Sequence, residues 1–348
     1  MKEIGPEHPL SYRKEVVRRL FGYVKSADSF FVIGGASAGK TRLLDFIMRE
    51  DVQNHYLEER AQSTWLIRVD LNRHLPGADW TFYELLISSM MLGSSRYEAA
   101  DEIFQQLANL DEKVMERRDD LQALRFFELA VHRLCKLYDL NVCFLLDEFD
   151  KMYHTMPKEI FAQLRAVRDA NKNQVCYGLF LRDLPERLRP PSENESFYEL
   201  LSHRMIGLGP LNYDDALRAL RQMEERREFR LEPIIREAIV HASGGHPGLM
   251  QALLSLNINF AIEKEQMGDF NWLIKQEFLQ DECQKIWESL SPEEQTALLE
   301  VVRGHFERIP QPVFKLITAK GLVQKQAHTY KMFSRIFELY LQGKARPA

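Results

Sequence analysis

Residues 30–43 read FFVIGGASAGKTRL, and this stretch decides how the rest of the chain is interpreted. Phe30–Ile33 is a short apolar run that ends at two glycines, which is typical of a fully buried strand. The next eight residues match the pattern G-x-x-x-x-G-K-S/T at every fixed position. Leu43, Leu44 and Ile47 follow with helical spacing. A strand, a glycine-rich loop and a helix in this order predict a P-loop that binds the phosphates of a nucleotide, whereas a glycine turn with a chance lysine would explain the loop alone.

The residue types of the loop match the chemistry of phosphate binding. Small side chains let successive backbone N–H groups turn toward phosphate oxygens, and the start of the following helix favours an anion. We expect the Lys40 ammonium to reach the β- and γ-phosphates and the Thr41 hydroxyl to bind Mg²⁺. The other loop residues expected at the nucleotide are Gly34, Gly35, Ala36, Ser37, Ala38 and Gly39.

Length and composition place the chain in a broad class. A chain of 348 residues exceeds the usual size of one core, so two or three domains are expected. Hydrophobic content of 45% and charged content of 28% are ordinary for a soluble globular protein. We find no apolar run of 18 residues and no signal-peptide core in MKEIGPEHPL, so neither a membrane span nor secretion is predicted. The four cysteines lie far apart without metal spacing, and Cys143 and Cys176 fall in strand-like apolar runs, which favours buried thiols in a reducing cytoplasm.

The charge distribution is uneven. Residues 308–348 contain eight Lys or Arg residues and one acid, a net charge of +7, while the whole chain carries −5 and the remainder therefore −12. A basic end on an acidic body suggests a polyanion or an acidic partner, although a solvated surface explains it equally well.

The first 208 residues are expected to form an α/β P-loop NTPase core. Strand-like runs alternate with helical patterns, which predicts a parallel wound sheet. The helical patterns cover 16–24, 80–139 and 160–170, and a polar loop is expected at 185–195. The predicted strands are Phe30–Ile33, Trp65–Asp70, Asn141–Leu146 and Val175–Leu181.

Beyond residue 208 the sequence predicts two further domains. Residues 209–268 contain three expected helices, with Asn212 as an N-cap, Pro233 as a first helical residue and a third helix from about Pro247, and we interpret them as a helical lid. Residues 269–348 begin with a helical stretch at 272–289 and continue with the capping box of Ser291-Pro292-Glu293-Glu294. A helix at 312–320, a hairpin of 322–324 with 330–333 and a last helix from Arg335 complete a predicted winged helix-turn-helix.

A P-loop needs an acid for its metal ion and a group that orders the attacking water. Asp147 ends a predicted strand, so we assign it to Mg²⁺ through water, and the adjacent Glu148 is placed to accept a proton from the hydrolytic water. Asp150 is either a second acid or a helix N-cap. Arg182 ends the next strand and could sense the γ-phosphate or form an ion pair with Asp183 or Glu186.

These motifs resemble those of the STAND class of AAA+-related P-loop NTPases, specifically its archaeal- and bacterial-ATPase-like members. The resemblance covers nearly the whole chain and rests on GGASAGKT, FLLDEFD, LRAVRDANKNQVCYGLFLRDL, IGLGPLNYDDALRAL, ASGGHPGLMQALL and the C-terminal WESLSPEEQTALL with YKMFSRIFELYL. It implies that Pro247 packs against the adenine end of ATP or ADP. One departure is Tyr12, which stands where the family commonly has a glycine before an arginine, here Arg13, and it puts an adenine contact there in doubt.

The resemblance implies a slow ATPase that acts as a conformational switch in signalling or regulation, with a protein partner or self-assembly for its output. An alternative is an ATP-gated DNA-binding regulator or initiator-like loader that uses the winged helix, which the basic end favours and the pI near 6.1 disfavours. A scaffold with a degenerate nucleotide site is a third class, which the intact Lys40, Thr41, Asp147 and Glu148 disfavour.

Overall fold

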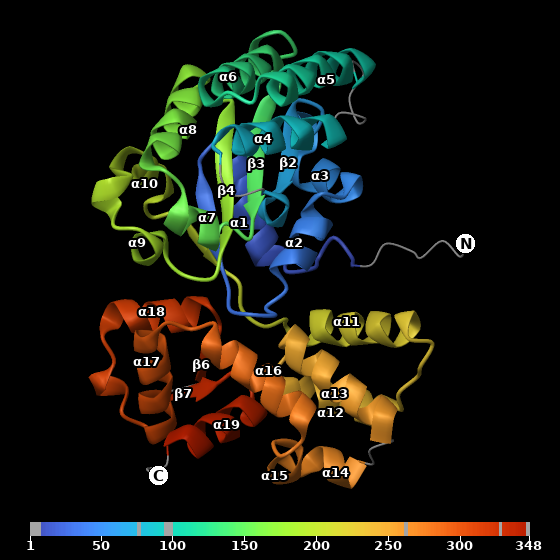
Figure 1. Ribbon diagram of the computed structural model, residues 1–348. Helices are drawn as coiled ribbons and strands as arrows, with labels where there is room; N and C mark the ends of the chain where they lie inside the picture. The colour runs from blue at the N-terminus through green and yellow to red at the C-terminus, as the bar shows by residue number, and fades with distance from the viewer. Residues whose placement is uncertain (1–7, 75–77, 94–99, 261–263, 327–328, 346–348) are drawn as a thin grey trace. The chain divides into compact units, whose positions relative to one another are not determined.

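A computed structural model describes residues 8–74, 78–93, 100–260, 264–326 and 329–345 of the chain (Figure 1). The chain forms two compact units, of which one consists of Val17–Val32 and Thr41–Ile206. The other contains the described residues before Val17, the loop segment Ile33–Lys40 and the chain from Gly207 onward. The predicted domain limits at residues 208 and 268 stay predictions.

A five-stranded sheet in the order β2-β3-β4-β1-β5 organises the first unit. β2 pairs in parallel with β3, and β3 pairs in parallel with β4. The strands are β1 Phe30–Ile33, β2 Thr64–Asp70, β3 Asn141–Asp147, β4 Val175–Leu181 and β5 Met205–Gly207. The predicted strands agree with β1 to β4, but β5 was not predicted, because three residues carry too little periodicity to be recognised.

Helices cover this sheet and account for most of the first unit. α4 packs against β2, and α5 and α6 pack against α4 (Figure 1). The helical region predicted at 80–139 is thus three helices, and the polar loop predicted at 185–195 is wrong, since it contains α9 and the start of α10. The helices are α1 Lys14–Lys25, α2 Lys40–Ile47, α3 Glu50–Leu57, α4 Trp80–Gly93, α5 Ala100–Arg117, α6 Asp120–Lys136, α7 Asp150–Thr155, α8 Lys158–Ala170, α9 Pro185–Leu188 and α10 Glu195–Leu201.

The parallel pairing aligns the ends of the strands. Asp70 of β2 lies opposite Asp147 of β3, so two carboxylates leave the sheet side by side. Cys143 and Cys176 face each other across β3 and β4 as buried thiols, and none of the four cysteines, all within the described ranges, forms a disulfide. The expectation of buried thiols is therefore confirmed.

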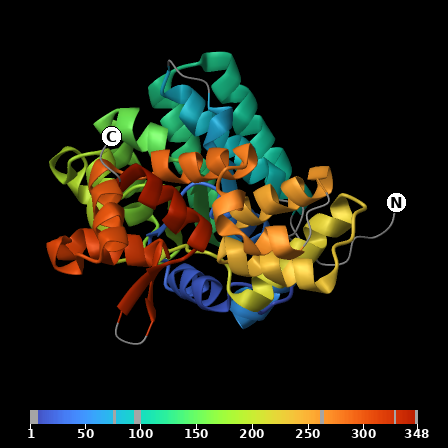
Figure 2. The ribbon, with the colours of Figure 1, turned by 90° about the horizontal axis from the view of Figure 1, so that it is seen from below.

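The second unit is mainly helical from Gly207 onward, with one hairpin of β6 Val323–Gln326 and antiparallel β7 Thr329–Met332 (Figures 1 and 2). The stretch predicted as helical at 272–289 is divided between α15 and α16. The helices are α11 Tyr213–Arg226, α12 Pro233–Ser243, α13 Pro247–Phe260, α14 Lys264–Gly268, α15 Phe270–Leu273, α16 Glu277–Glu288, α17 Pro292–Arg303, α18 Gln311–Ala319 and α19 Arg335–Ala345.

Local capping chemistry sets several of these helix ends. The Asn212 side chain accepts a hydrogen bond from the third residue of α11, and Ser291 and Glu294 form the predicted capping box of α17. Gly244 and Gly304 end α12 and α17 with positive φ angles of 58° and 80°. None of the described helices combines the length and the apolar character that crossing a lipid bilayer requires.

Candidate functional site

The P-loop is folded back on itself in this structure. The Lys40 ammonium is buried and donates hydrogen bonds to the carbonyl oxygens of Gly34, at 2.9 Å, and Gly35, at 3.4 Å. Ser37 and Gly39 have positive φ angles of 53° and 92°, which bend the loop tightly. A loop closed around its own lysine has the ammonium already at the position from which it could reach an anion inside the loop.

Three side chains from distant parts of the sequence hold this loop within the second unit. The backbone N–H of Ala36 donates to the Ser289 hydroxyl at 3.0 Å, and the Arg13 guanidinium donates to the Ala38 carbonyl at 2.8 Å. The His246 imidazole hydrogen-bonds to the backbone of Ala36. At least one backbone N–H that a phosphate could use is therefore satisfied by a hydroxyl of the protein itself.

Arg13 joins the loop to the chain after residue 207. Its backbone N–H donates to Asp215 at 2.9 Å, and its guanidinium donates to the Gly209 carbonyl at 2.8 Å as well as to the loop. Arg13 is buried and has a positive φ of 45°, a conformation that costs energy for a residue other than glycine. Arg13, whose adenine contact the family resemblance left in doubt, thus hydrogen-bonds to the P-loop and holds it in place.

The segment His246-Pro247-Gly248 lies against the same loop. Burial lowers the pKa of His246 to about 3, so the imidazole is neutral at pH 7 and its Nδ1 accepts the N–H of Leu249 at 3.4 Å. A Cβ added to Gly39 would lie 3.7 Å from Cγ of Pro247. A Cβ on Gly248 would meet Ser37 and the Glu282 carboxylate at 2.7 and 1.9 Å, so only glycine fits there.

Asp147 ends β3 as a buried carboxylate. Its Oδ2 accepts from Nη2 of Arg68 at 3.1 Å, whereas its Oδ1 is buried and has no hydrogen-bond partner among the described residues. Burial raises the pKa of Asp147, and the neighbouring Arg68 opposes that shift. An unsatisfied carboxylate oxygen in the interior is costly, so it marks a place where a cation or an ordered water would be favourable.

Glu148 and Arg182 pair with each other. Arg182 donates to Oε2 of Glu148 at 2.7 Å, and Glu148 has a positive φ of 54°. The ion pair of Arg182 is therefore with Glu148 and not with Asp183 or Glu186, the two partners considered from the sequence. The carboxylate expected to act as the base is thus paired with a guanidinium. Asp150 is the first residue of α7 rather than its N-cap, and its Oδ1 accepts the backbone N–H of Arg182 at 2.7 Å.

The donors present fit a magnesium ion only together with a nucleotide. Mg²⁺ takes oxygen ligands. Asp147 offers a buried carboxylate, and the exposed Thr41, the second residue of α2, offers a hydroxyl. Within the described ranges no group of three or more His, Cys, Asp or Glu side chains could hold a metal alone. Phosphate oxygens would have to supply the remaining ligands.

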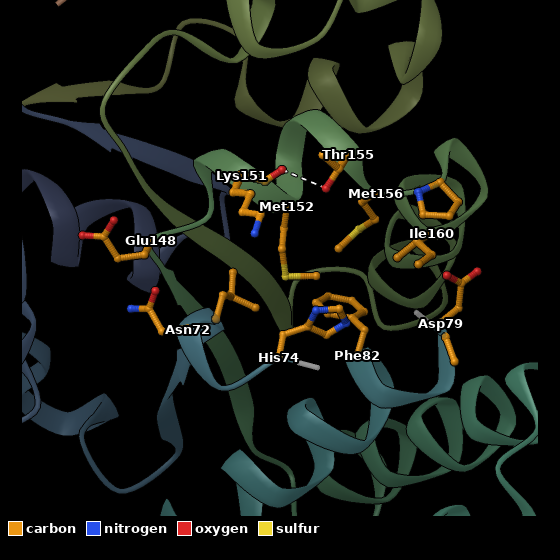
Figure 3. Close-up of a pocket in the computed structure, with 13 residues that line it drawn as sticks. Asn72, His74, Asp79, Phe82, Glu148, Lys151, Met152, Thr155, Met156 and Ile160 are labelled. Carbon is orange, nitrogen blue, oxygen red and sulfur yellow. Dashed lines mark hydrogen bonds between the residues drawn. The ribbon is translucent and has the colours of Figure 1, made fainter. Parts of the chain in front are cut away.

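A pocket of about 370 Å³ borders Glu148 (Figure 3). Its walls come from the segment after β2, including Asn72 and His74, and from α7, where Lys151 and Met152 point into the hollow (Figure 3). Phe82 contributes to the apolar floor. Glu148 lies at the edge of this pocket, and its carboxylate points away from the hollow (Figure 3).

Comparison with known proteins supports the fold. Neither the models of protein families nor the curated protein sequences give a match. Among solved structures, the chain is similar to the Walker-type ATPase PABY2304 of Pyrococcus abyssi, with 16% identity, 95% of each chain covered and a TM-score of 0.54. It is also similar to the ORC2 protein of Aeropyrum pernix in its ADP form, with 14% identity, 99% of this chain and 97% of that chain covered and a TM-score of 0.53. The chain therefore has an α/β P-loop NTPase fold.

Sequence reasoning did not single out Arg68, Ser289 or His246 as site residues. For Arg68 the sequence did contain a signal, because an arginine lies two residues before the end of the predicted strand in WLIRVD. Ser289 gave none, because its partner lies 253 residues away.

Proposed function

We propose that the chain is a STAND-type ATPase that binds ATP and ADP, hydrolyses ATP slowly and changes conformation with the bound nucleotide. The observation that supports this most is the hydrogen bond from Ala36 N–H to Ser289. A phosphate that used this N–H would have to displace a hydroxyl that lies at the end of α16. Nucleotide binding and the position of that helix would then be linked.

The residues of the P-loop and of β3 have complementary roles in this proposal. Lys40 would neutralise the β- and γ-phosphates, while Thr41 and Asp147 would hold Mg²⁺. The metal would supply charge neutralisation on the transferred phosphoryl group. Backbone N–H groups of 34–39 would orient the phosphates.

Glu148 would act as the general base, provided that its ion pair with Arg182 opens. The carboxylate would accept a proton from the attacking water, and the freed guanidinium would turn to the γ-phosphate. Ion pairing with Arg182 thus describes a resting arrangement in which Glu148 is occupied. This gating is consistent with slow turnover.

The lid at 209–268 and the winged helix at 269–348 complete the proposal. His246 and Pro247 adjoin the P-loop, and the resemblance gives Pro247 a place at the adenine end of the nucleotide. A hairpin that follows α18 and precedes α19 is the arrangement expected of a winged helix. Output would pass to a protein partner or to another copy of the chain.

Replacement of Pro247 by alanine tests the lid. We expect ADP to dissociate at least about threefold faster, because the ring that would restrain the nucleotide is lost while Lys40 is untouched. Stopped-flow displacement of a fluorescent ADP measures this rate. Pro233→Ala, at the start of α12, is the matched control, and equal rates for Pro247→Ala and the parent would mean that the glycines and the proline only separate two helices.

The proposed function is tested by the nucleotide content of the purified protein together with its turnover. We expect ADP to remain bound through purification and steady-state hydrolysis to be slow and limited by product release. Nucleotide-free protein that hydrolyses ATP rapidly would contradict the switch.

A second candidate, the initiator-like DNA-binding protein, is favoured by exposed cations around the hairpin. Lys325 and Lys331 lie on β6 and β7, which project from the surrounding helices (Figure 2), and Lys315 is exposed on α18. Lys320 does not contribute, because it forms a fully buried ion pair with Glu294 at 2.7 Å.

DNA binding would depend on salt in a defined way. If these three lysines contact phosphates, the full chain should bind duplex DNA with a log–log salt slope of about −3, and Lys325→Glu with Lys331→Glu should remove about two units of it. Fluorescence anisotropy of a labelled duplex measures the slope. Arg125→Glu, on the surface of α6, is the control, and absence of binding at 50 mM salt would exclude this candidate.

A further inference from the structure

Arg68 is a charged residue within β2, and its place in the sheet determines what it can reach. It pairs in register with Leu145, so Asp147 is its diagonal neighbour on the same face of the sheet. Nη2 of Arg68 lies 3.1 Å from Oδ2 of Asp147, and Nη1 lies 2.5 Å from Oδ1 of Asp45. The guanidinium therefore bridges strand β3 and helix α2.

The bridge lies beside the position proposed for the metal. Asp45 follows Thr41 by four residues in α2, so the two side chains project from the same face of that helix. Thr41 and Asp147 are the two residues that would hold Mg²⁺. Arg68 contacts Asp147 directly, and it also contacts Asp45, which lies one helical turn after Thr41. A guanidinium and a divalent cation would thus compete for the same carboxylate.

The local charges explain why a resident cation is present. Asp70 and Asp147 lie opposite each other, and Glu148 follows directly, so like charges accumulate at the ends of β2 and β3. Arg68 offsets only part of this charge, since Oδ1 of Asp147 has no hydrogen-bond partner in the part of the chain that the structure describes. The arginine is 29% exposed and its second partner, Asp45, is 58% exposed, so the guanidinium can move toward solvent without leaving Asp45.

We propose that Arg68 is an internal counter-ion that pairs with Asp147 when no metal is bound and withdraws to Asp45 when Mg²⁺ accompanies a nucleotide. Arg68 thereby sets how much Mg²⁺ strengthens nucleotide binding. This inference rests on the proposed function. Its role is one of positioning, because Arg68 acts through Asp147.

The test compares ADP affinity with and without Mg²⁺ in variants of the bridge. Fluorescent ADP is titrated in excess EDTA and in 5 mM Mg²⁺, about the physiological total concentration. The readout is the Kd in EDTA divided by the Kd in Mg²⁺, which rises when Mg²⁺ strengthens ADP binding more. In Arg68→Gln the ratio should rise about tenfold or more, because a positive charge next to a divalent cation is removed. In Asp45→Asn the ratio should fall below that of the parent, since Arg68 then has Asp147 as its remaining partner.

Two further variants separate this role from a structural one. Arg68→Lys keeps the charge and should leave the ratio near that of the parent, whereas Arg125→Gln removes an exposed arginine on α6 and should not change it. A lower melting temperature of Arg68→Gln would not by itself change the ratio, because both Kd values are measured on the same folded variant. An unchanged or lower ratio in Arg68→Gln overturns the inference, and failure of the parent to bind ADP under either condition overturns the proposed function instead.

Discussion

Replacement of Lys40 by alanine is expected to abolish nucleotide binding. Lys40 is the only basic residue from Phe30 to Lys40, and its ammonium is already buried inside the loop at 2.9 Å from the Gly34 carbonyl. Loss of a charge-assisted contact to two phosphates costs about 3–4 kcal/mol, which weakens binding on the order of 10²- to 10³-fold. Isothermal titration with ADP and with a non-hydrolysable ATP analogue measures the loss.

Lys25→Ala is the control for this variant. Lys25 is the half-buried last residue of α1 and pairs with the exposed Glu58 at 3.1 Å, so its replacement should leave nucleotide affinity unchanged. Ordinary ATP affinity in Lys40→Ala would mean that residues 34–41 are not a nucleotide site.

Replacement of Glu148 by glutamine is expected to slow ATP hydrolysis on the order of 10²- to 10³-fold while ATP affinity changes less than about threefold. An amide cannot accept the proton of the attacking water, but it preserves the size of the side chain. The ion pair with Arg182 is also lost, yet both side chains are partly exposed, so stability should change by less than about 1 kcal/mol. Single-turnover phosphate release separates the chemical step from product release.

Glu193→Gln, an exposed acid beyond α9, is the control for charge removal. Unchanged turnover in Glu148→Gln would place the base elsewhere. Asp150 would then be the next candidate, although its Oδ1 is already used by the backbone N–H groups of Arg182 and Asp183.

The parts of the fold that depend on neighbours in sequence could be predicted from sequence. β1 and β4 have the predicted ends, and the Ser291 capping box and the Gly244 and Gly304 helix ends are set by residues within a few positions of each other. Such features are specified by local backbone chemistry, which a single sequence displays directly.

The parts that depend on distant partners could not be predicted. β5 is too short to carry a period, and it joins the sheet through pairing with β1, about 170 residues earlier. The partners of Arg182 and Arg68 follow from sheet register and helix placement. The sequence indicated that Arg182 was near the site but not which carboxylate it would bind, and it did not single out Arg68.

The proposed conformational switch requires that the protein holds its nucleotide and releases it slowly, and one measurement tests this most directly. Displacement of a fluorescent ADP from the parent protein in a stopped-flow instrument gives the dissociation rate, which is compared with steady-state phosphate release from ATP. We predict that the two rates agree within about threefold, because release of ADP limits turnover. An ADP dissociation rate more than about tenfold faster than turnover would contradict the conformational switch.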